Sequence, residues 1–131
     1  MARVTGIGGV FLRARDPEAL GRWYREHLGI PFAEGSAMLH ARDDDPDATA
    51  VWATFEFDTE YFGSASQQVM INYRVDDLDA LLESLRASGV AESRRQDEPY
   101  GKFAWITDPE GNRIELWEPL AVAAAENAAP A

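Results

Sequence analysis

The chain carries one strand-and-helix pattern twice, and this repetition constrains its fold more than any other feature. Residues 10–30 run from an apolar strand into an aspartate-led helix that closes at a glycine, and residues 71–90 do the same. The spacing is nearly equal in the two copies, from Asp16 to Gly29 and from Asp77 to Gly89. Two copies roughly 60 residues apart indicate two similar supersecondary units packed as one body, and a cleft between paired units is a natural ligand site.

The sequence marks both ends of each expected helix. Asp16 is a capping residue followed by proline at the first helical position, and Gly29 suits the left-handed residue that ends a helix. The second helix is expected to begin after Asp76 or Asp77 and to end at Gly89. Apolar and aromatic residues recur at helical spacing in both, at Leu20, Trp23, Tyr24, His27 and Leu28, and at Leu78, Leu81, Leu82 and Leu85.

The remaining chain reads as short strands. We expect them near 31–35, 37–42, 49–57, 90–95, 101–107 and 112–117, with a turn over residues 108–112 and an acidic loop at 42–47. Each half then reads strand, helix and three strands, so the expected class is α+β. The expected organisation is a single domain over 1–120, with a first module at about 5–57, a linker at 58–67, a second module at about 68–118 and an Ala-rich tail at 121–131.

Composition narrows the class of partner. The net charge is −11, which argues against nucleic acid and against anionic membrane surfaces. The chain has no cysteine, so disulfides and thiolate metal sites are excluded. The N-terminus lacks the apolar core of a signal peptide, and no apolar run approaches the ~20 residues of a membrane span. We therefore expect a cytoplasmic protein with no nucleic-acid or membrane partner.

Two motifs within this order resemble the vicinal oxygen chelate superfamily. They are Leu28-Gly29-Ile30 and Asp108-Pro109-Glu110-Gly111-Asn112-Arg113-Ile114-Glu115-Leu116. Members include glyoxalase I, fosfomycin-resistance enzymes, extradiol dioxygenases and bleomycin-resistance proteins. The resemblance covers about residues 5–119. It implies two βαβββ modules whose sheets curl into a cup with the helices outside, and it implies a homodimer.

The resemblance also implies where the metal enzymes of the superfamily place their ligands. The first-strand histidine position is Gly9 here, and its counterpart in the second half is Met70. The glutamate of the first module falls at Ala53 or a neighbour, and only the last ligand, Glu115, is retained. Glycine and alanine have no donor atom, and a methionine thioether is poorly matched to Zn²⁺, Mn²⁺ or Fe²⁺. We therefore expect no metal and no cofactor.

Strand alternation then assigns the residues that line the expected cup. The candidates for ligand binding are Phe11, Arg13, Trp52 (or its neighbour Val51), Asn72, Arg74, Tyr100, Phe103, Trp105 and Trp117. Glu115 also faces the expected cup and is the candidate catalytic residue. These aromatic rings either fill the cup as packing or form a pocket for a flat, partly apolar molecule. Tyr100 is either a hydroxyl donor at the mouth or a loop residue packed on its own hairpin.

Glu115 admits two interpretations. It is either a relic paired with Arg13 or Arg74, or a working acid or base. The leading hypothesis is metal-independent binding of an aromatic or cationic small molecule, as in bleomycin-resistance proteins, which the negative charge favours. The alternative is a lyase or isomerase that uses Glu115 for proton transfer, with Arg13 or Arg74 stabilising an oxyanion. A third possibility is a scaffold with a filled cup.

Overall fold

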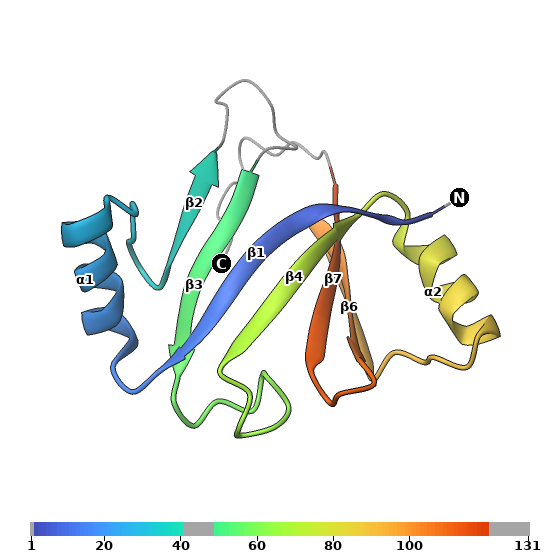
Figure 1. Ribbon diagram of the computed structural model, residues 1–131. Coiled ribbons are helices and arrows are strands. Elements are labelled where there is room, and N and C mark those ends of the chain that lie inside the picture. The colour runs from blue at the N-terminus through green and yellow to red at the C-terminus, as the bar shows by residue number, and fades with distance from the viewer. Residues whose placement is uncertain (1, 41–48, 121–131) are drawn as a thin grey trace. The chain divides into compact units, whose positions relative to one another are not determined.

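The computed structural model describes residues 2–40 and 49–120. The expected acidic loop tip and the Ala-rich tail lie outside these residues. The chain divides into two compact units, which we call the α1 unit (Ile7–Asn72) and the α2 unit (Met1–Gly6 with Tyr73–Ala131). Each unit contains one helix and its strands (Figure 1). In the described residues no helix is long and apolar enough to cross a membrane.

The α1 unit is a helix packed on mixed strands. Its elements are most of β1 (Val4–Ala14), α1 (Pro17–Leu28), β2 (Ser36–His40), β3 (Thr49–Glu56) and the start of β4 (Val69–Val75). Strand β3 pairs in parallel with β1 and antiparallel with β2. Hydrogen-bonded neighbours in this unit run β2-β3-β1-β4.

The ends of α1 form as the sequence predicts. The Asp16 carboxylate accepts a hydrogen bond of 3.0 Å from the backbone N–H of Ala19. Gly29 takes the left-handed conformation, with φ of 73°, and its N–H donates back to Arg25. The helix covers a core of Phe32, Ala37 and Trp52. Gly21 makes this packing possible, because a Cβ there would lie only 2.3 Å from the Phe32 ring.

The α2 unit also packs one helix on its strands, and β6 pairs antiparallel with both β5 and β7. It contains the end of β4, then α2 (Leu78–Ala87), β5 (Arg94–Glu98), β6 (Gly101–Thr107) and β7 (Arg113–Pro119). Hydrogen-bonded neighbours run β4-β7-β6-β5. Asp77 caps α2 by accepting from the N–H of Ala80 at 3.1 Å. The Asp108 turn forms as predicted, with a bond of 2.9 Å from its N–H to the Asn112 carbonyl.

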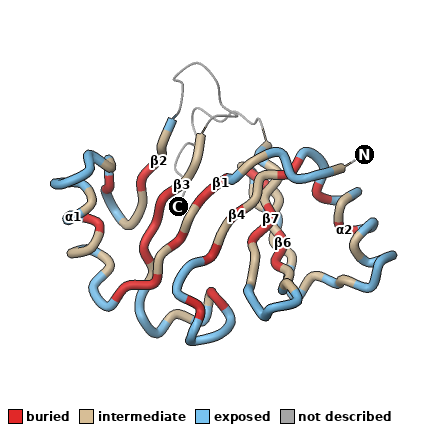
Figure 2. Tube along the Cα trace, viewed as in Figure 1, coloured by how far each residue is buried: buried red, intermediate tan, exposed pale blue. Residues whose placement is uncertain are grey.

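One side of the α2-unit sheet packs on the helix. Its core contains Val75, Leu78, Leu82, Ala104 and Leu116. On both helices most residues are exposed or half-buried, whereas the buried positions gather along the strands (Figure 2). The Glu118 carboxylate accepts from the N–H of Leu78 at 2.8 Å, and this bond ties the first turn of α2 to β7.

Ion pairs connect α2 with β5 and β6. Asp79 on the helix lies 2.7 Å from Arg95 on β5 and 2.8 Å from Lys102 on β6. Hydrogen bonds from these two cations hold the pKa of the Asp79 carboxyl below its usual value, and the bond from Lys102 has the larger effect. Arg95 also pairs with Asp97 on its own strand.

The predicted α+β class is confirmed, with seven strands and two helices in residues 2–40 and 49–120. The second half has the predicted strand, helix and three strands. The prediction of a strand at 31–35 is wrong, because only Ala33 forms an isolated bridge, to Ser36. Glu34 and Gly35 both take positive φ, 53° and 92°, and turn the chain there. The strand expected at 90–95 begins later, at Arg94.

Candidate functional site

The side of the α2-unit sheet away from its helix carries a row of aromatic rings. Because Ala104 and Leu116 point into the helix-side core, alternation turns their strand neighbours to the other face. We call Tyr100, Phe103, Trp105 and Trp117 the aromatic row. The Phe103 and Trp117 rings are parallel within 4°, with centroids 6.1 Å apart, and Trp105 lies 6.3 Å from Phe103. Tyr100 meets Phe103 edge to face at 5.9 Å.

Glu115 lies beside Trp105 on this face of the sheet and is only 2% exposed. It stands directly across from Trp105 in the β6–β7 pairing, and its Oε1 accepts a 3.0 Å hydrogen bond from the indole Nε1–H. The Arg94 guanidinium lies over the Trp105 ring, 4.8 Å from its centroid. The Trp105 indole therefore contacts a carboxylate at its N–H edge and a cation over its ring.

Burial and two carboxylates act on Tyr100 at one end of the row. Burial, together with the charges of Glu98 and Glu115, raises the pKa of the Tyr100 phenol. The phenol therefore keeps its proton at neutral pH. Its hydroxyl can donate a hydrogen bond to a ligand.

The α2 unit thus brings together Tyr100, Phe103, Trp105, Glu115 and Trp117 as a group of predicted site residues. Arg74 belongs to the same unit, on β4, and is half-buried. Its guanidinium lies against Gly6, where a Cβ would be 2.9 Å from Nη1. The other predicted residues, Phe11, Arg13, Trp52 and Asn72, lie in the α1 unit.

Arg13 has a structural task that the sequence did not reveal. Its guanidinium is 7% exposed and donates to backbone carbonyls of the segment that follows β3. The acceptors are Gln67 at 3.0 Å, Thr59 at 3.1 Å, Ser64 at 3.1 Å, and Phe57. The guanidinium also lies 5.1 Å from the Phe62 ring centroid. Arg13 therefore organises residues 57–67.

Phe11 belongs to a second aromatic cluster, within the α1 unit. It lies 5.3 Å from Phe55 and 6.5 Å from Tyr61, and Tyr61 stacks on Phe55 at 5.0 Å. Phe62 completes the cluster with no exposed surface. Sequence reasoning missed the contribution of residues 57–67; the density of aromatic residues at Phe55, Phe57, Tyr61 and Phe62 was the available signal.

The other two predicted residues of the α1 unit are buried. Trp52 lies in the core under α1, with its ring 4.8 Å from that of Tyr24. Within the α1 unit it therefore has a packing role, and its part in ligand binding stays a prediction. Asn72, on β4, is 3% exposed.

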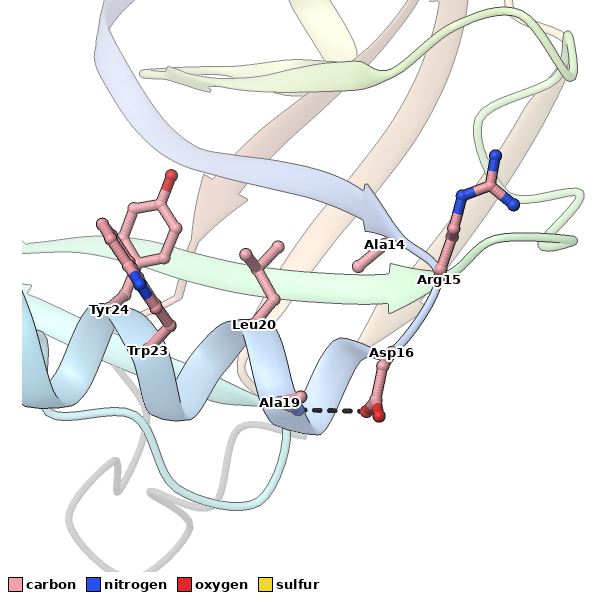
Figure 3. A pocket seen from close by; sticks show the side chains of 7 residues that line it. All are labelled: Ala14, Arg15, Asp16, Ala19, Leu20, Trp23 and Tyr24. Atoms are coloured by element: carbon pink, nitrogen blue, oxygen red, sulfur yellow. Dashed lines mark hydrogen bonds between the residues drawn. The ribbon is translucent and has the colours of Figure 1, made fainter.

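A shallow groove of about 630 Å³ runs along the start of α1 (Figure 3). Ala14 and Arg15, at the end of β1, line one part of the groove. Leu20, Trp23 and Tyr24 line it from the helix. Trp23 is 50% exposed, and the His27 ring stacks on it at 4.6 Å. The homodimer expected from the sequence stays a prediction.

The sequence profile of the glyoxalase-like domain matches residues 9–117, which is most of the chain. The chain belongs to the glyoxalase-like family. Among curated proteins, none matches it.

Solved structures share the fold of this glyoxalase-like chain. Methylmalonyl-CoA epimerase from Mycobacterium tuberculosis is 24% identical with a TM-score of 0.63, and the match covers 93% of each chain. A variant of the Streptomyces coelicolor methylmalonyl-CoA epimerase, in complex with 2-nitronate-propionyl-CoA, is 18% identical with a TM-score of 0.69, over 91% of this chain and all of that one. A glyoxalase/bleomycin resistance protein/dioxygenase superfamily member from Vibrio splendidus 12B01 is 13% identical, with a TM-score of 0.55. The match covers 90% of this chain and 99% of that one.

The residues at the superfamily's metal positions do not fit a metal ion. A Cβ at Gly9 would lie 2.8 Å from the Val51 carbonyl oxygen and 3.2 Å from the Val51 Cβ, so no histidine fits there without moving β3. Ala53 has no donor, and Met70 is fully buried with a soft thioether. In the described part of the chain, no three His, Cys, Asp or Glu side chains group as ligands.

Proposed function

We propose that this protein binds a planar organic molecule on the aromatic row, without a metal ion. The Val75, Leu78, Leu82, Ala104 and Leu116 core of the α2 unit lies on the helix side of its sheet. The rings of Tyr100, Phe103 and Trp117 stand on the other side and are only half-buried. Half-buried aromatic rings set side by side on a sheet are suited to stacking on a flat ligand.

The charge pattern favours a ligand with a positive charge. The chain carries −11, and Glu98 and Glu115 both act on Tyr100 at one end of the row. A negative protein attracts cations during diffusion, and aromatic faces hold them at short range. The ligand class that fits best is a planar aromatic cation.

The observation that carries the proposal is the bond between Trp105 and Glu115. An indole N–H and a buried carboxylate on adjacent strands fix each other at 3.0 Å. Burying a carboxylate is costly, and a core position would more cheaply hold an apolar residue. Its place beside Trp105 in the aromatic row gives a bound cation an electrostatic partner.

A second candidate is an isomerase, which the likeness to methylmalonyl-CoA epimerases favours. In that reaction class a base removes the proton from the carbon next to a thioester carbonyl, and the electron pair moves onto the carbonyl oxygen as an enolate. The proton then returns to carbon. Glu115 would be the base, since it is a carboxylate held in place by a neighbouring donor.

Calorimetric titration with 1-methylquinolinium, a planar aromatic cation, tests the binding proposal. We expect saturation at one ligand per chain and at least a fivefold loss of affinity in Phe103→Ala, which removes one ring of the row. Phe57→Ala is the matched control, because Phe57 is an exposed ring in the α1 unit. Absence of binding to the wild type, or equal binding by Phe103→Ala, contradicts the proposal.

Incubation with methylmalonyl-CoA in deuterium oxide tests the isomerase. An isomerase incorporates deuterium at the carbon next to the thioester carbonyl, measured by mass spectrometry above the rate in buffer. Glu115→Gln keeps the shape of the side chain and should abolish that incorporation. A wild type that exchanges no faster than buffer rules out this second candidate for this substrate.

A further inference from the structure

The Trp117 indole rests on a glycine. A Cβ built on Gly101 would lie 2.5 Å from Trp117 Nε1 and 2.9 Å from its Cδ1. Those distances are shorter than any side chain tolerates, so only glycine at position 101 leaves room for the ring. The ring also stands parallel to Phe103, its partner across the β6–β7 pair. We call this position of the indole its seat.

The seat leaves one polar atom unsatisfied. Trp117 Nε1 is buried and finds no hydrogen-bond acceptor among the residues that the structure describes, although the side chain as a whole is half-buried. A buried N–H without an acceptor destabilises the arrangement that hides it. Trp105, the other tryptophan of the row, has no such problem, because its Nε1–H donates to Glu115.

We propose that Trp117 is a movable ligand-binding residue: its indole leaves the seat on Gly101 and donates its Nε1–H to a hydrogen-bond acceptor on the ligand. This rests on the proposed function and sharpens the ligand class. The ligand carries a carbonyl or similar acceptor beside its planar ring. The ring stacks on Phe103 and the acceptor satisfies Trp117, so binding removes the cost of the hidden N–H.

The difference in hydrogen bonding between Trp105 and Trp117 supports this assignment. The Trp105 indole is 3% exposed and held by a hydrogen bond. The Nε1–H edge of the Trp117 indole makes no hydrogen bond in the described residues and is held only by packing. It packs against Gly101, which has no side chain to block movement of the ring. Of the two rings, Trp117 is therefore the one that can turn at low cost.

Two probes that differ only in an acceptor test the inference. They are 1-methylquinolinium and 3-acetyl-1-methylquinolinium, titrated by calorimetry into the wild type and three variants. We expect the wild type to bind the acetyl probe roughly threefold to tenfold more tightly, the effect of one hydrogen bond. Trp117→Phe keeps a ring but loses the donor, so it should bind both probes equally. Trp23→Phe, the same change on α1, should retain the wild-type preference.

Gly101→Ala gives a second test, because it should free the Trp117 donor where Trp117→Phe removes it. The added methyl group occupies the seat and displaces the indole before any ligand arrives. Tryptophan emission should move to longer wavelength, and the preference for the acetyl probe should be at least as large as in the wild type.

The outcomes separate this inference from the proposed function. If the wild type binds both probes equally, or if Trp117→Phe keeps the preference, the role of Trp117 is refuted while binding on the row stands. If neither probe binds the wild type, the proposed function fails, and the inference fails with it.

Discussion

Trp105 and Glu115 face each other across β6 and β7, and the indole Nε1–H of Trp105 donates a 3.0 Å hydrogen bond to Glu115 Oε1. Both side chains are almost fully buried. The pair links the aromatic row to the carboxylate that the sequence resemblance assigns to a ligand position. It therefore combines a structural role with the electrostatic role that we propose for ligand binding.

Trp105→Phe should destabilise the protein. The change keeps an aromatic ring but withdraws the donor from a buried carboxylate, and the expected loss in the free energy of unfolding is about 1–3 kcal/mol. Urea denaturation followed by circular dichroism measures it. Trp23→Phe is the control, with an expected change within about 0.5 kcal/mol because Trp23 is half exposed. Equal unfolding midpoints for the two variants would show that the bond contributes nothing.

Arg13 should be critical for residues 57–67. Replacing it with Met removes the donors to four backbone carbonyls, and we expect a loss of about 3 kcal/mol or more. Arg13→Lys keeps the charge but not the planar fork, so it should rescue only part of that loss. Limited proteolysis should then cut within 57–67. Arg15→Met, an exposed neighbour, serves as the control; if it is as harmful as Arg13→Met, the assignment is wrong.

Asp79 should make stability dependent on acidic pH. Its pKa is lower in the folded protein than the ordinary value of about 3.9, so its contribution is complete above that value and is lost as pH falls through the folded pKa. Asp79→Asn should lower the unfolding midpoint at pH 7 and have little effect near pH 2. Because the side chain is 57% exposed, added salt should shrink the difference at pH 7. A difference that grows toward low pH contradicts this sign.

The wild type should bind far less than one equivalent of Zn²⁺, Mn²⁺, Fe²⁺, Co²⁺ or Ni²⁺. Gly9, Ala53 and Met70 offer no suitable donors. Gly9→His should not restore a site, because β3 occupies the space, and it should instead lower the melting temperature. Elemental analysis after equilibration with each ion measures this. One equivalent bound to the wild type would overturn the metal-free assignment.

The features that could be predicted from the sequence are those set by neighbouring residues, namely the helix ends and the alternation of side chains along strands. Asp16, Gly29 and Asp77 act at the helix ends as expected, because capping depends on neighbouring backbone groups. Alternation along β6 and β7 placed Phe103, Trp105 and Glu115 on one face correctly, because Ala104, Ile106, Ile114 and Leu116 form an apolar stripe on the other.

The sequence could not predict what depends on distant partners. Nothing near Arg13 shows that carbonyls more than 40 residues away will occupy its guanidinium. Trp52 lies on a strand whose apolar residues do not alternate regularly with polar ones. Only its tertiary contact with Tyr24 shows that its side chain faces α1. The strand expected at 31–35 fails because Glu34 takes a positive φ, which non-glycine residues seldom adopt.

The central claim is that the aromatic row binds a planar cation, and the four tryptophan indole resonances test it most directly. A titration of ¹⁵N-labelled protein with 1-methylquinolinium, followed by ¹H–¹⁵N spectra, reports on each indole separately once single Trp→Phe variants assign the signals. We predict saturable shifts for Trp105 and Trp117, with Trp23 and Trp52 unmoved. Shifts confined to Trp23 or Trp52, or none at all, would contradict the account.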